Sequence, residues 1–131
     1  SAPVRPFPGL ISILIGGSAP SEALLRDLES RVTPNVQVTY GSTELGSTAR
    51  SSPASRLVQP ASAGRLVPWV EGQAVGEDDQ PLPAGQQGLL RFRGRDGGMA
   101  SDYLGDEAAT AQAFRGGWFY PGDTGSVDAL G

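Results

Sequence analysis

The chain has 131 residues, a formal net charge of −4, no cysteine and no histidine. This length fits one domain or a piece of a larger one, and the lack of cysteine and histidine excludes disulfides, thiolate chemistry and the commonest zinc ligands. Its ten cationic residues are all arginines and are scattered along the chain, which argues against binding of nucleic acid because that requires clustered cations. No apolar run reaches the roughly 18 residues of a membrane span, and a cytoplasmic protein is expected.

The first half of the chain predicts a βαβ unit. Residues 1–9 contain three prolines and are expected to be a linker or the edge of an excised piece. Residues 10–15 form a short apolar run that predicts a buried, parallel strand, and residues 36–40 predict a second strand. Between them, a helix starting at Pro20 is expected because apolar residues recur on one helical face. The βαβ part is expected to span residues 10–60.

The second half predicts a β-rich part over residues 61–131. Residues 46–63 are rich in Ser, Ala and Pro without periodicity, and are expected to form a long loop. Asp106 can cap a short helix that ends at Gly116-Gly117. The remaining expectations are strands at 64–67, 70–75, 87–93 and 125–128, with a turn at 76–80. The fold class predicted for the chain is therefore mixed α/β: a βαβ piece, then a small, mostly antiparallel sheet or barrel with one short helix.

Two short segments about eighty positions apart carry the candidate chemistry. The first is Tyr40-Gly41-Ser42-Thr43-Glu44, at the expected carboxyl end of a strand, where ligands collect in α/β units. An aromatic ring can pack on a purine, Thr43 offers a hydroxyl and an amide to a phosphate, and Glu44 offers a carboxylate to Mg²⁺. Alone, this segment is equally consistent with a strand-to-loop turn that carries an exposed acid.

The second segment is Gly117-Trp118-Phe119-Tyr120-Pro121-Gly122-Asp123. An Asp held at a tight turn presents two acceptor oxygens that suit the 2′- and 3′-hydroxyls of a ribose. Alternatively, the aromatic residues are core residues under a turn and Asp123 is a turn former. Together the two segments predict an adenine-nucleotide site in which Glu44 and Asp123 converge on one nucleotide.

In this order the segments resemble the adenylate-forming superfamily, which includes acyl- and aryl-CoA ligases, luciferases and peptide-synthetase adenylation domains. The matches in the sequence are Gly16-Gly17-Ser18-Ala19-Pro20, residues 40–44, Gly64-Arg65-Leu66-Val67-Pro68 with Val70-Glu71, Gln80-Pro81-Leu82-Pro83 with Gly85 and Gly88-Leu89-Leu90, Tyr103-Leu104 with Glu107-Ala108-Ala109-Thr110, and residues 117–123. Pro121 departs from the family's usual Thr or Ser.

The resemblance implies a role for each candidate residue. Tyr40 packs on adenine, Thr43 contacts the α-phosphate and Glu44 binds Mg²⁺, so that Thr43 and Glu44 are the catalytic candidates. Asp123 holds the ribose. The other implied cofactor-binding residues are Gly16, Gly17, Ser18, Gly41 and Ser42.

For the parent enzyme the resemblance implies activation of a carboxylic acid with ATP and Mg²⁺, release of pyrophosphate, and transfer of the acyl group to CoA. The family's phosphate loop and catalytic lysine fall outside this chain, which has no lysine. The chain is therefore expected to be a fragment of the large N-terminal domain, inactive alone and able to self-associate through exposed sheet surfaces. The alternatives are a non-catalytic binding or structural module, and a fragment of a peptide-synthetase adenylation domain.

Overall fold

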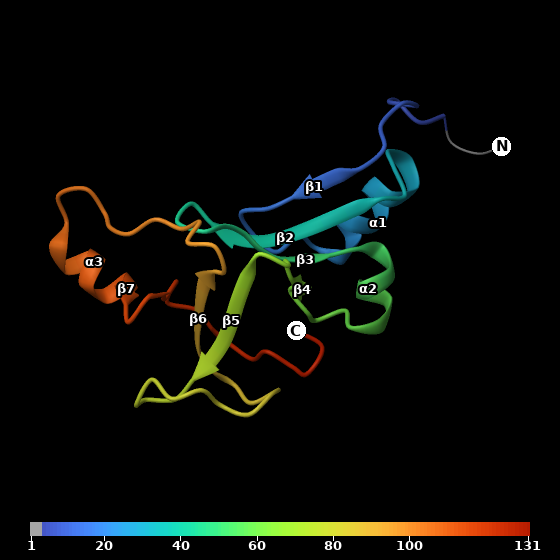
Figure 1. Cartoon of the computed structure of the whole chain (residues 1–131). Helices are drawn as coiled ribbons and strands as arrows, with labels where there is room; N and C mark the ends of the chain where they lie inside the picture. Colours follow the sequence, from blue (N-terminus) through green and yellow to red (C-terminus); the bar gives the residue numbers. More distant parts are fainter. Residues whose placement is uncertain (1–3) are drawn as a thin grey trace. The chain divides into compact units, whose positions relative to one another are not determined.

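The computed structural model describes residues 4–131 and divides the chain into two compact units (Figure 1). One unit contains the described residues up to Gly41 together with Ala49–Arg65, and the other contains Ser42–Thr48 and Leu66–Gly131. The expected linker at 1–9 lies partly outside the described residues.

The first unit contains the expected βαβ arrangement. Strand β1 (Ile13–Ile15) pairs in parallel with β2 (Val36–Ser42), and α1 (Glu22–Arg31) connects them. The helix starts at Glu22, two residues later than expected, because Ser21 caps it: the Ser21 side chain accepts a hydrogen bond from Leu24 N at 3.2 Å. Strand β1 is shorter than expected and only half-buried, with Leu14 49% exposed. It lies at the edge of the described four-stranded sheet, whose order is β1-β2-β3-β4.

The expected long loop at 46–63 is wrong. This stretch forms strand β3 (Gly46–Ser51) and helix α2 (Pro53–Val58), and β4 (Arg65–Leu66) follows. The helix begins with a capping box, in which the Ser52 side chain accepts a hydrogen bond from Ser55 N at 3.2 Å and the Ser55 side chain accepts one from Ser52 N at 2.8 Å. Arg56 then binds the Glu29 carboxylate and donates to Val36 O at 2.9 Å. Small and polar residues thus form regular structure here without an apolar pattern.

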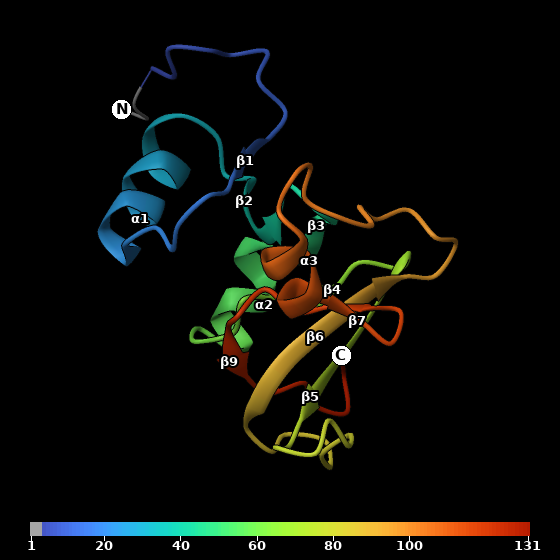
Figure 2. The same cartoon turned by 90° about the vertical axis from the view of Figure 1, so that its left-hand side faces the viewer.

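The second unit is built on an antiparallel ribbon. Strands β5 (Val70–Val75) and β6 (Gly88–Gly94) pair over six residues, from Val70↔Gly94 to Val75↔Leu89, and run side by side in Figures 1 and 2. Strand β8 (Trp118–Phe119) pairs with β6 and with β7 (Phe114–Arg115), and β9 (Thr124–Gly125) pairs with the start of β6. The antiparallel sheet and the mixed α/β class are therefore confirmed.

The single helix of this unit, α3 (Glu107–Ala113), begins as expected at Asp106, whose side chain accepts from Ala109 N at 2.9 Å. The expected helix end is wrong, because Phe114 has extended backbone and belongs to β7. Gly116 and Gly117, with φ of +60° and +78°, form the turn between β7 and β8 rather than the helix cap. The last strand is likewise two residues long rather than four.

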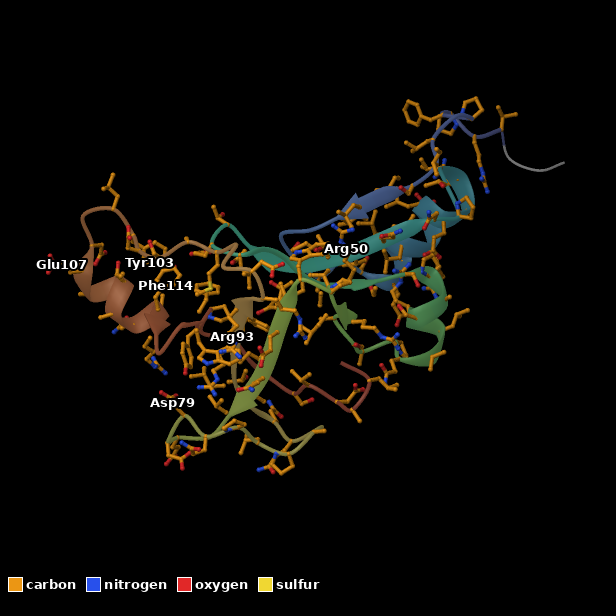
Figure 3. The ribbon with its side chains drawn as sticks, in the orientation of Figure 1. Arg50, Asp79, Arg93, Tyr103, Glu107 and Phe114 are labelled. Carbon is orange, nitrogen blue, oxygen red and sulfur yellow. The ribbon has the colours of Figure 1, made fainter. Side chains whose placement is uncertain are left out.

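Aromatic and aliphatic side chains form the core of the second unit. Val75, Trp118 and Tyr120 are buried together, with Leu89 packed against them. The guanidinium groups of Arg91 and Arg93 lie 4.5 and 4.3 Å from the Trp118 ring centroid, and Figure 3 shows Arg93 on its strand. The aromatic residues of the second predicted segment are therefore core residues, as the alternative interpretation predicted. Gly122 and Asp123 at the end of this segment remain exposed.

Candidate functional site

The segment that ends in Glu44 is the tip of a β-hairpin. Strand β2 ends at Ser42, Thr43–Leu45 form the turn, and β3 starts at Gly46, whose φ is +75°. Leu45 is buried and anchors the turn, while Thr43 is exposed. The main chain of Glu44 is fixed from the opposite side, because its carbonyl accepts a hydrogen bond from Ala100 N at 2.7 Å. The hairpin therefore presents the Thr43 hydroxyl and the Glu44 carboxylate on adjacent residues of a constrained turn.

The Glu44 carboxylate is held in its ionised form. Tyr103 Oη donates a hydrogen bond to Glu44 Oε1 at 2.5 Å, and this bond is the main reason that the pKa of Glu44 lies below its usual value. The backbone amide of Glu44 lowers that pKa further, and partial burial opposes both effects. The same hydrogen bond raises the pKa of Tyr103, so the phenol keeps its proton and remains a donor.

The residue before the turn carries an unsatisfied polar group. Ser42 Oγ is buried and has no hydrogen-bond partner within the described part of the chain. A buried hydroxyl without a partner costs about 1–3 kcal/mol, and such groups are normally satisfied by protein, water or a ligand. Ser42 Oγ makes no hydrogen bond of ordinary geometry, but it lies close enough to Glu44 to help lower the pKa of that carboxylate.

These residues fit a magnesium ion that is shared with a substrate. Among residues 4–131 no group of three or more Asp, Glu, His or Cys side chains could hold a metal. Mg²⁺ usually retains water and is held by one or two carboxylates together with substrate phosphates. One ionised carboxylate with the neighbouring hydroxyls of Ser42 and Thr43 suits that mode of binding, and does not suit an all-protein metal cage.

Asp123 lies at a turn on the rim of the second unit's sheet. It follows Gly122, whose φ is +89°, and precedes β9. Its carbonyl accepts from Leu90 N on β6 at 2.9 Å, so the backbone is tied to the sheet while the residue stays exposed. The carboxylate is thus presented from a fixed backbone.

The remaining candidate residues lie in the first unit. Because β1 and β2 are parallel, their carboxyl ends share one edge, which places Gly16 beside Thr39 and next to Tyr40-Gly41. A Cβ at Gly16 would lie 2.8 Å from Thr39 Cγ2, so a larger residue there would require the Thr39 side chain to shift. Gly17 has a φ of +95° and Ser18 is exposed. The convergence of all these residues on one nucleotide stays a prediction.

The sequence did not identify Tyr103 as part of the candidate site. Tyr103 matched a family motif, but no role was assigned to it, since its partner is 59 positions away along the chain. The signal in the sequence would have been a tyrosine that pairs with a distant carboxylate. Many such pairs can be formed in any sequence, so this signal does not single out Tyr103. In the part of the chain that the structure describes, no helix has the length and apolar character needed to cross a membrane.

Comparison with known proteins places this geometry in context. The model of one protein family, described as AMP-binding enzyme, matches residues 2–104. The 2-succinylbenzoate–CoA ligase of Geobacillus sp. (strain WCH70) is 35% identical over 91% of this chain and 24% of its own length. The fatty acid–[acyl-carrier-protein] ligase ScoC of Streptomyces coeruleorubidus is 30% identical over 97% of this chain and 25% of its own length.

A solved structure has the same fold over nearly the whole chain. O-succinylbenzoate coenzyme A synthetase from Bacillus subtilis, in complex with ATP and magnesium ion, matches with a TM-score of 0.80 and 26% identity over 97% of this chain. The match covers 26% of that chain. This chain therefore spans about a quarter of the length of the relatives it matches.

Proposed function

Since the chain belongs to the AMP-binding enzyme family, as the motif resemblance predicted, we propose that it is part of an ATP-dependent carboxylate-activating ligase. In this reaction an oxygen of a carboxylic acid attacks the α-phosphorus of ATP. Pyrophosphate leaves and an acyl-adenylate forms, whose acyl group then passes to a thiol. Because this chain spans only a quarter of its relatives, the activity is proposed for the protein that carries this sequence.

In the proposed mechanism the hairpin tip acts on the phosphates. Thr43 is exposed and donates its hydroxyl hydrogen to an oxygen of the α-phosphate. Glu44, which the Tyr103 hydrogen bond keeps ionised, holds Mg²⁺. The bound ion supplies positive charge to the phosphate oxygens as negative charge builds up on them. The Ser42 hydroxyl, which also helps to lower the pKa of Glu44, is the third polar group available to this end of the nucleotide.

The other candidate residues bind the nucleoside. Tyr40 packs against the adenine ring, and Gly41 allows close approach of the backbone. Gly16, Gly17 and Ser18 line the strand-to-helix turn beside it. Asp123 accepts hydrogen bonds from the ribose hydroxyls, an interaction that its exposure and its fixed backbone favour. These roles follow from the family motifs and are proposals for this chain.

The observation that carries the proposal is the family match over residues 2–104, which includes the constrained turn and its ionised carboxylate. The test is ATP–pyrophosphate exchange by the protein that carries this sequence, with 2-succinylbenzoate and a fatty acid as the first carboxylic acids, since relatives are named for them. Mg²⁺-dependent exchange is expected with at least one aryl or acyl carboxylate, together with its loss in Glu44→Gln. Exchange that survives Glu44→Gln undiminished would refute the assigned role.

The acyl acceptor is proposed to be CoA. A carrier protein is the second candidate, because one relative at 30% identity is named as an acyl-carrier-protein ligase. The two are separated by offering the enzyme its best carboxylic acid with either CoA or a phosphopantetheinyl carrier protein, and measuring thioester formation. Turnover with the carrier alone would exclude CoA as the acceptor.

The 131-residue chain by itself is expected to show no exchange. Charge stabilisation at the α-phosphate needs cationic groups; the family resemblance assigns this role to a catalytic lysine, and the sequence contains no lysine. Measured turnover by the isolated polypeptide would contradict this. If the longer protein also lacked exchange activity and did not bind ATP in the presence of Mg²⁺, the alternative of a non-catalytic module would be favoured. A cytoplasmic location is part of the proposal.

A further inference from the structure

Tyr103 is fixed in place independently of its hydrogen bond to Glu44. Its amide donates to Thr110 Oγ1 at 2.9 Å, and Thr110 Oγ1 in turn donates to Asp106 O at 2.7 Å. The first turn of α3 therefore holds the main chain of Tyr103. The loop before it is also anchored, since Ala100 N donates to Glu44 O at 2.7 Å.

The Tyr103 ring continues into the aromatic core of the same unit. Its centroid lies 5.4 Å from that of Phe114, and the two rings are tilted by 60° (Figure 3). Phe114 lies 5.3 Å from Phe119, which is buried and pairs with Phe92 on β6. Offset aromatic pairs at such distances stabilise one orientation of the rings. The phenol is thus rigidly aimed, and its hydroxyl ends on Glu44 Oε1 at 2.5 Å.

We propose that Tyr103 is a positioning residue that fixes the orientation of the Glu44 carboxylate and thereby sets the affinity of the nucleotide site for Mg²⁺. A carboxylate has about four lone-pair sites, so one donated hydrogen bond restricts its rotation and still leaves capacity for a cation. Groups that hydrogen-bond to a metal ligand typically change metal affinity or activity by about 10- to 100-fold when they are removed. This inference rests on the proposed function.

A merely structural hydrogen bond is the competing explanation. The geometry argues against it, because the main chain of Glu44 is already held by Ala100 and that of Tyr103 by Thr110. The packing of the ring on Phe114 does not need the hydroxyl. Replacing Tyr103 with phenylalanine therefore removes the bond to the carboxylate and keeps the anchors on both sides of it.

The experiment compares Tyr103→Phe with wild type in the protein that carries this sequence. Binding of ATP is measured by calorimetry at increasing Mg²⁺, and ATP–pyrophosphate exchange is followed over the same Mg²⁺ range. We expect the Mg²⁺ concentration for half-maximal effect to rise about 10-fold or more in both measurements. The thermal midpoint is expected to stay close to wild type.

Tyr120→Phe is the matched control. Tyr120 belongs to the same unit, is buried, and its hydroxyl oxygen accepts from Arg91 Nη1 at 3.1 Å without touching Glu44. Tyr120→Phe also removes one neutral hydroxyl group, so we expect a small loss of stability and an unchanged Mg²⁺ requirement. Should Tyr103→Phe not fold, Thr110→Val is measured in the same way, since it loosens Tyr103 but keeps the phenol. A raised Mg²⁺ requirement in that variant supports the proposal.

The outcomes separate this inference from the proposed function. Wild-type exchange and Mg²⁺-dependent ATP binding, with equal Mg²⁺ requirements in Tyr103→Phe and Tyr120→Phe, would leave the ligase intact and overturn the positioning role. A loss of thermal stability in Tyr103→Phe without any change in Mg²⁺ requirement would overturn it as well. Absence of exchange and of ATP binding in wild type would instead overturn the proposed function, and the positioning role with it.

Discussion

Substitution of Gly64 by alanine is expected to destabilise the first unit far more than the same change at another glycine of similar conformation. Gly64 has a φ of +109° and immediately precedes β4. A Cβ built there would lie 2.1 Å from both Arg50 C and Arg50 O, and 2.4 Å from Ser51 N. All three atoms belong to the main chain of β3, so no side-chain rotation can relieve the overlap.

The magnitude follows from two contributions. A residue with a Cβ at this positive φ costs about 1–3 kcal/mol in backbone strain. Carbon atoms in contact are normally about 3.5–4.0 Å apart, so β3 and the segment around Gly64 must separate by more than about 1 Å. This separation breaks roughly one or two backbone hydrogen bonds, at about 0.5–1.5 kcal/mol each. The expected total is about 1.5–6 kcal/mol, a large part of the ordinary 5–15 kcal/mol of stability.

Gly85→Ala is the control for this experiment. Gly85 also has a positive φ, +82°, but a Cβ there meets no atom within 4 Å, so only the backbone strain applies. With a urea m-value of about 1–3 kcal/mol/M, Gly64→Ala is expected to unfold at a urea midpoint about 1 M below that of Gly85→Ala. Equal midpoints for the two variants would refute the steric reasoning.

Three further predictions concern the site and the surface. Asp123→Ala is expected to raise the KM for ATP in the exchange assay about tenfold or more, by loss of the hydrogen bonds to the ribose; an unchanged KM would remove Asp123 from the site. Because the pKa of Glu44 is lowered in the folded protein, the stability that this carboxylate contributes is present above about pH 4.3, the ordinary glutamate pKa, and is lost as the pH falls through the lowered pKa. The stability advantage of wild type over Glu44→Gln is therefore expected to shrink between pH 6 and pH 3 in urea titrations, and a constant difference would contradict this sign. The isolated chain exposes Ile11, Leu57, Val58 and Leu104, each more than 80% accessible, and we expect concentration-dependent association in sedimentation velocity, whereas a monodisperse monomer at high concentration would count against it.

The elements that the sequence predicted well are those whose local signals agree with their tertiary environment. The βαβ order, strand β5 and the cap at Asp106 were each indicated by apolar spacing or by capping chemistry, and the structure contains all three. The edge position of β1 could not be read from its apolar run, because burial depends on what covers a sheet face.

Two of the failures share one physical cause. Strand β3 buries Thr48, Ala49 and Ser51 but has no large apolar residue, so period-2 hydrophobicity was absent even though pairing with β2 and β4 forms the strand. Phe114 continues a helical apolar pattern, yet its ring packs on Tyr103 and Phe119 from a strand. In both cases long-range pairing overrode local propensity.

The difference between local and long-range signals also explains which parts of the candidate site the sequence predicted. Residues 40–44 are contiguous, so their spacing alone indicates that a hydroxyl and a carboxylate lie on neighbouring positions of one turn. What fixes that carboxylate is not contiguous with it: Ala100 holds its main chain and Tyr103 its side chain, from a loop more than fifty residues later. A sequence motif can therefore identify the group that meets the ligand, whereas the residues that set its orientation, and with it the affinity for Mg²⁺, emerge only when the chain folds back on itself. If Tyr103→Phe leaves the Mg²⁺ requirement unchanged, the hairpin alone orients Glu44 and the motif already contains the whole metal-binding element.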